Sequence, residues 1–195
     1  MIQFTETYTW KQQAVLSKLS KLRLVIDMVN FSIDGYIENI FQVSEMAAIE
    51  GMKIFAKRLD LSGIKNFRAI SKIEIYGKPQ AKQLSVDDFV GIELEKENLD
   101  ITDYRKMGLA HALLEPPYGL GLKKNVEKYT YLYKVFVQDF LGINNRNKNS
   151  FTIYEWSDDW SNYFDDGKEW WGTYYWTIFN RNTNTIIVVG GSSTD

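Results

Sequence analysis

Apolar side chains recur at helical spacing in two long stretches of the chain. In the first, residues 37–55, they mark one face of a helix that should end near Leu59, because Leu61-Ser62-Gly63 follows. In the second, residues 123–141, they predict another long helix. Shorter helices are expected over residues 11–20 and from an N-cap at Thr102 to Leu114.

Short runs rich in β-branched and aromatic residues are typical of strands, and they dominate the last third of the chain. The final two expected strands are joined through residues 181–184, which predicts a hairpin. Residues 22–29 leave two interpretations open, a strand or the continuation of the first helix. The expected strands are residues 70–76, 89–95, 151–156, 173–180 and 185–189.

Helices early and strands late indicate an α+β fold. We expect the helices of the N-terminal and middle parts to pack on a mainly antiparallel sheet that ends in the C-terminal hairpin. A length of 195 residues suits a single domain over residues 1–195. The polar, Asn-rich stretch Gly142–Ser150 is the best candidate for an exposed loop or an internal boundary.

Composition excludes several kinds of chemistry. The chain has no Cys and one His, which rules out a disulfide scaffold, a Cys nucleophile and a multi-His metal site. The single histidine, His111, lies in an expected helix and is interpreted as a hydrogen-bonded or exposed helical residue. We therefore expect no cofactor and no metal, and we favour a binding role over an enzymatic one.

Charge and tryptophan are both concentrated near the C-terminus. Residues 155–195 hold seven acidic and two basic residues, a net charge of −5, against +3 for the rest of the chain. Five of the six Trp lie between Trp156 and Trp176, and residues 154–176 hold six acidic residues. Aromatic rings and carboxylates together are enriched where proteins meet partners, so residues 154–176 are the candidate functional segment.

Binding to a basic protein partner is the favoured interpretation of this segment. In size, acidity and aromatic content the chain is similar to immunity proteins, the small inhibitors that neutralise nuclease toxins, although it carries no family motif. Trp160, Tyr163 and Phe164 are expected to be the rings most exposed, because they lie in a polar stretch. The candidate binding residues are Asp158, Asp159, Trp160, Tyr163, Phe164, Asp165, Asp166 and Glu169.

Three other interpretations stay open. Trp platforms and paired carboxylates also suit carbohydrate binding or hydrolysis. Clustered Asp residues suit a Ca²⁺ site, although the spacing here is not that of an EF-hand loop. The third is purely structural, with the rings in the core and the Asp pairs in turns and helix caps.

No targeting or membrane-spanning segment is visible in the sequence, so the expected location is the cytoplasm. We expect neither nucleic acid nor a membrane as a partner. The sequence leaves the oligomeric state open.

Overall fold

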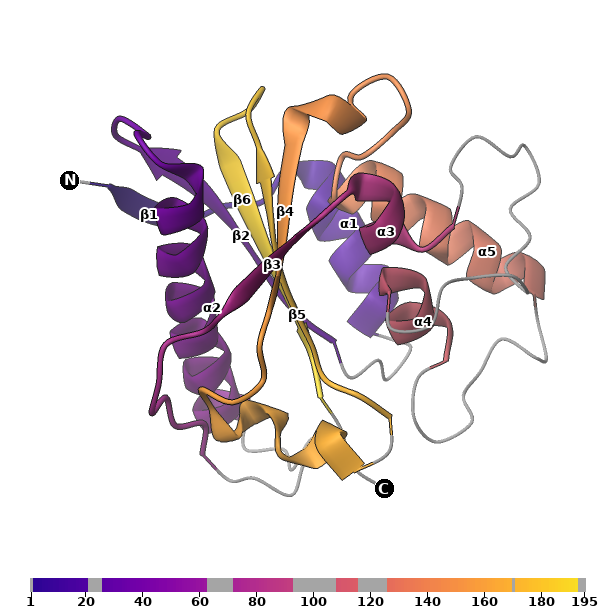
Figure 1. Cartoon of the computed structure of the whole chain (residues 1–195). Coiled ribbons are helices and arrows are strands. Elements are labelled where there is room, and N and C mark those ends of the chain that lie inside the picture. Colours follow the sequence, from indigo (N-terminus) through magenta and orange to yellow (C-terminus); the bar gives the residue numbers. More distant parts are fainter. Residues whose placement is uncertain are drawn as a thin grey trace.

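The computed structural model describes residues 2–20, 26–62, 72–92, 108–115, 126–169 and 171–192. Its centre is one six-stranded sheet in the order β1-β2-β6-β5-β4-β3, with every neighbouring pair antiparallel (Figure 1). The strands are β1 (Gln3–Glu6), β2 (Ile26–Asp34), β3 (Ala81–Leu84), β4 (Phe151–Trp156), β5 (Tyr174–Asn180) and β6 (Thr185–Gly191).

Helices cover both faces of this sheet. The long helix α2 lies on one face, and the other helices lie on the opposite face (Figure 1). Among the described helices, none is long and apolar enough to cross a bilayer. The helices are α1 (Trp10–Leu19), α2 (Ile40–Ser62), α3 (Val86–Val90), α4 (Leu109–Leu114) and α5 (Val126–Val135), which runs into a π-helical turn at Phe136–Phe140.

The core has two layers because the central strands are buried on both faces. Successive side chains of a strand point to opposite sides, so Tyr175 and Phe179 of β5 pack beneath α2. Trp176 and Ile178, between them in sequence, pack against the helices of the other face. Each large apolar side chain buried in this way contributes about 1.5–3 kcal/mol.

The α+β prediction is confirmed, including the C-terminal hairpin of β5 and β6. The strand over residues 151–156 and the helices over 11–20, 37–59 and 123–141 are also found, with shifted ends. For residues 22–29 the strand interpretation is correct from Ile26 onward, and residues 22–25 lie outside the described residues. The expected N-cap Thr102 lies outside them as well.

Two expected strands differ in the structure. Residues 89–95 were expected to form a strand, but Phe89 and Val90 belong to α3, which begins after Ser85, and residues 93–95 lie outside the described residues. The Ser85 hydroxyl accepts a hydrogen bond from the Asp88 amide at 3.0 Å, and this N-cap favours the helix. In the described part of residues 70–76, pairing is limited to an isolated bridge between Ile75 and Ser161.

Candidate functional site

The candidate segment folds across one end of the sheet. β4 ends at Trp156 and β5 begins at Tyr174, and residues 157–173, here called the capping segment, connect them around that end. The capping segment contains two short 3-10 turns, Asn162–Phe164 and Asp166–Glu169. In Figure 1 these turns lie below the sheet, at the end opposite the β5–β6 turn.

The described aromatic rings of the capping segment point into the core, which corrects the expectation that three of them are exposed. Trp160 is 1% exposed, and Tyr163 and Phe164 are fully buried. All three join Tyr175 in the core layer beneath α2. Polar residues surround these rings in the sequence, and Asp159 and Asp165 among them are exposed, but the rings themselves point inward.

Ring contacts and hydrogen bonds hold this arrangement. The Trp160 ring meets the Tyr175 ring edge-on at 5.4 Å, and its indole N–H donates to the Ser157 carbonyl at 2.7 Å. The Tyr163 hydroxyl donates to Asp27 of β2 at 2.9 Å. A turn fixed in this way holds its outward side chains in place.

The candidate carboxylates differ in their exposure. Asp159 and Asp165 are exposed and Asp158 is half-buried. Asp166 is only 7% exposed, so the prediction that it belongs to an outer binding surface is wrong. The side chain of Glu169 lies outside the described residues.

Asp158 and Asp159 differ from Asp165 in their partners. Asp158 accepts a hydrogen bond from the Thr173 hydroxyl at 2.8 Å, and Asp159 accepts one from the Ser157 hydroxyl at 2.6 Å. Within the part of the chain that the structure describes, neither carboxylate has an ion-pair partner. Asp165 pairs with Lys168 at 3.4 Å. Two adjacent negative charges are thus oriented by neutral hydroxyls.

Exposed apolar side chains also lie next to the capping segment, but they come from another segment. Ile75 is 37% exposed and Tyr76 is 61% exposed. The Tyr76 amide donates to the Trp160 carbonyl at 3.0 Å, which places Tyr76 next to the capping segment. Sequence reasoning missed both residues, because no local pattern shows that residues 74–76 run alongside residues 160–162.

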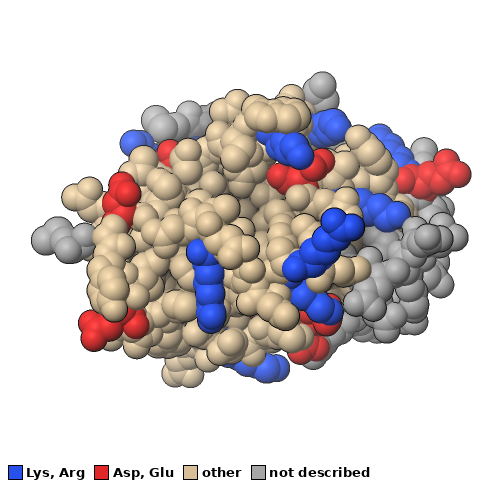
Figure 2. Space-filling model, turned by 90° about the horizontal axis from the view of Figure 1, so that it is seen from above, with Lys and Arg blue, Asp and Glu red and all other residues tan. Residues whose placement is uncertain are grey.

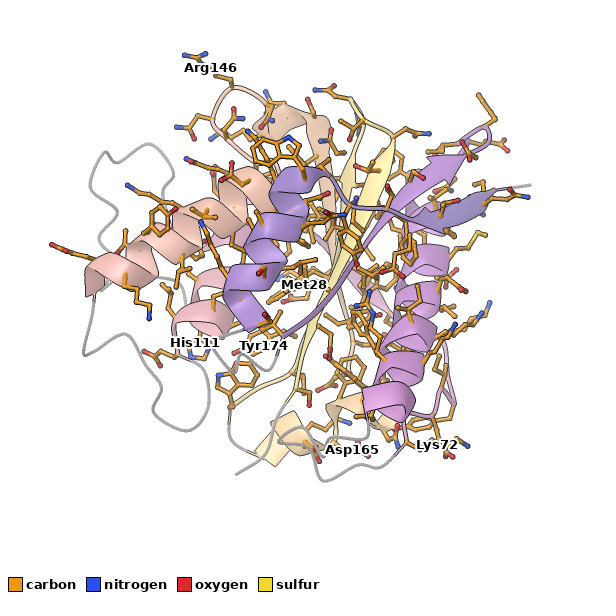
Figure 3. The ribbon with its side chains drawn as sticks, turned by 180° about the vertical axis from the view of Figure 1, so that it is seen from behind. Met28, Lys72, His111, Arg146, Asp165 and Tyr174 are labelled. Atoms are coloured by element: carbon orange, nitrogen blue, oxygen red, sulfur yellow. The ribbon has the colours of Figure 1, made fainter. Side chains whose placement is uncertain are left out.

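The single histidine also meets the capping segment. His111 of α4 lies with its Nδ1 2.5 Å from the Tyr174 hydroxyl and its Nε2 3.6 Å from a carboxylate oxygen of Glu115, and Figure 3 shows His111 beside Tyr174. The Trp171 indole donates to the Glu115 carbonyl at 2.7 Å. The Glu115 carboxylate, the His111 imidazole and the Tyr174 phenol thus contact one another in sequence, but Tyr174 is only 2% exposed. The observed contacts tie α4 to the capping segment.

Charges of both signs lie at each end of the sheet. Figure 3 shows Asp165 and Lys72 at the end with the capping segment and Arg146 at the other. Seen from that other end, Lys and Arg side chains lie over the central part of the surface, with Asp and Glu side chains among them and at the edges (Figure 2). Within the described ranges, no group of three or more His, Asp or Glu side chains could hold a metal ion.

Buried tyrosine hydroxyls predict how stability depends on pH. Burial raises the pKa of Tyr175 well above 10.0, and nearby Tyr163 and Asp27 raise it further. Burial likewise raises the pKa of Tyr133 well above 10.0. Above a pH of about 10 the unfolded chain loses these protons while the folded chain keeps them, so the free energy of unfolding should fall by about 1.4 kcal/mol per pH unit for each tyrosine.

Urea unfolding between neutral and strongly alkaline pH measures this slope. Tyr175→Phe should reduce the slope, and Tyr36→Phe, at a ring 87% exposed, should leave it unchanged. Equal slopes in the Tyr175→Phe and Tyr36→Phe proteins would contradict the burial of Tyr175.

No protein-family model matches the chain, and no curated protein matches its sequence significantly.

Proposed function

We propose that this protein is a binding module whose capping segment presents carboxylates to a basic protein partner. The observation that carries the proposal is the pair Asp158 and Asp159, two oriented carboxylates without an ion-pair partner among the described residues. Such a pair attracts a cationic surface and favours Arg or Lys side chains that reach both carboxylates.

A rigid support under these carboxylates favours binding. The Trp160, Tyr163 and Phe164 rings are packed in the core, so the turn that carries the acids is already ordered before a partner arrives. Binding then costs less conformational entropy than ordering a mobile loop. The buried rings thus support the proposed site without touching the partner.

Ile75 and Tyr76 supply the apolar contact that an interface needs. Tyr is enriched among the side chains that dominate binding energy, and Tyr76 is largely exposed. A partner that covers Tyr76 and places a cation over Asp159 would combine both kinds of contact. The specific form that we propose is an inhibitor, similar in mode to immunity proteins, that occupies the cationic surface of an enzyme.

An array of peptides tests this proposal. One set is rich in Lys and Arg, and a matched set carries Gln at the same positions. The wild-type protein should retain the basic set, more weakly as salt rises. Asp158→Asn with Asp159→Asn should lower this retention at least about tenfold, the effect of losing about 1.4 kcal/mol.

A second adjacent pair of acids provides the control. Asp87 and Asp88 are exposed in the first turn of α3, so changing both to Asn removes the same charge elsewhere. This control should bind basic peptides as the wild type does. An equal loss of peptide binding in both double variants would mean that net charge alone causes the effect. It would contradict a binding site at the capping segment.

The carbohydrate interpretation has less support. Stacking on sugars needs exposed ring faces, and Trp156, Trp160, Trp171 and Trp176 are all buried. Trp170 lies outside the described residues.

A further inference from the structure

The outward side of α2 carries apolar residues in its middle. Gln42, Met46, Ile49 and Lys53 follow one another at spacings of three and four residues, so they form one line along the helix. Met46 is 43% exposed, whereas Val43, Ala47 and Met52 face the sheet and are buried. Figure 1 shows α2 as the outermost layer on its side of the sheet.

Charge along this outward side is divided between the two halves of the helix. Glu45 and Glu50 lie in the N-terminal half, and Lys53 and Lys57 lie in the C-terminal half. Glu50 pairs with Lys53 of the same helix at 3.1 Å. The helix dipole does not explain this order, because it acts within the first and last turns and α2 has no acid in its first turn and no base in its last. It also does not explain the apolar Met46 and Ile49, which lie between Glu45 and Glu50.

We propose that the outward side of α2 is a dimer interface, occupied by α2 of a second copy in antiparallel orientation. A two-fold axis near residue 51 would bring Glu45 of one copy toward Lys57 of the other. The same axis also brings Glu50 of one copy toward Lys53 of the other. The midpoint between residues 50 and 53 differs by only half a residue from the midpoint between residues 45 and 57. One register therefore satisfies both pairs and places Met46 and Ile49 in the interface.

A second copy fits this surface through its own symmetry. In a two-fold interface the same patch meets itself, so a patch with one acidic half and one basic half is complementary to its own antiparallel copy. The interface is small, so dimerisation should be weak and should depend on protein concentration.

Charge reversal in two variants tests the pairing. The first variant carries Glu45→Lys and Glu50→Lys, and the second carries Lys53→Glu and Lys57→Glu. Sedimentation velocity over a wide range of protein concentration should show the wild type dimerising. Each variant alone should dimerise at least about tenfold more weakly, because like charges then face each other across the interface. An equimolar mixture should form a heterodimer.

Reversal at two exposed glutamates outside α2 is the matched control. Glu74→Lys with Glu127→Lys makes the same change in net charge as the first variant. This control should dimerise as the wild type does. Met46→Glu, a single exposed change, should weaken dimerisation without unfolding the chain, as circular dichroism would show. A wild type that stays monomeric at every concentration, or a mixture that forms no heterodimer, would overturn the proposal.

Discussion

Replacing Gly167 with alanine should destabilise the protein by about 3 kcal/mol or more, an effect at the upper end of overpacking substitutions. An alanine Cβ at this position would lie 2.3 Å from the Gly172 carbonyl oxygen and 2.8 Å from the Ser192 hydroxyl. Gly167 also donates its amide to Ser192 at 2.9 Å and accepts a hydrogen bond from the Gly172 amide at 2.8 Å. Because the closest obstacle is backbone, no side-chain rotation relieves it.

Urea unfolding measures this loss, and two companion variants identify its cause. Lys168→Ala changes the exposed neighbour in the same turn and should shift stability by no more than about 0.5 kcal/mol. Ser192→Gly, combined with Gly167→Ala, removes the softer of the two contacts. The combined variant should remain strongly destabilised, because the clash with the Gly172 carbonyl remains. Recovery of wild-type stability in the combined variant would refute this packing of the capping segment.

Truncation of Trp160 is the second large effect. Trp160→Ala should cost about 3–5 kcal/mol, the usual cost of removing a buried aromatic side chain. The ring packs against Phe164 at 5.7 Å and Tyr175 at 5.4 Å, so its removal opens a cavity beneath α2. Trp160→Phe, which keeps part of the ring volume, should cost less than Trp160→Ala.

Trp10 provides the matched comparison, because it is the same residue type at 75% exposure. Trp10→Ala should change the free energy of unfolding by about 0.5 kcal/mol or less. Similar losses in Trp160→Ala and Trp10→Ala would mean that Trp160 is exposed and that the capping segment is folded differently.

Local patterns were sufficient for the main elements of the fold. Runs rich in β-branched and aromatic residues identified β4, β5 and β6, and helical spacing identified α2. Local patterns failed where two signals competed. At Phe89 and Val90 the apolar run favoured a strand, but the Ser85 cap favoured the helix that the structure contains.

The sequence marked residues 154–176 as the candidate segment, but the expected exposure of Trp160, Tyr163 and Phe164 was wrong. Burial of Trp160 depends on Tyr175 and Phe164, and the latter also lies in the polar stretch. Burial of Tyr163 depends on Phe55 of α2, more than 100 residues earlier in the chain. Contacts of this kind follow from the topology and leave no period in the local sequence. The exposed Tyr76 was missed for the same reason.

Hydroxyl-radical footprinting read by mass spectrometry most directly tests the central claim that the capping segment turns Trp160, Tyr163 and Phe164 into the core. In the folded protein, Trp160, Tyr163 and Phe164 should be oxidised slowly, because they are 1% exposed or less. Tyr76, at 61% exposure, should be oxidised readily and serves as the internal reference. Oxidation of Trp160 and Tyr163 as fast as that of Tyr76 would contradict the account.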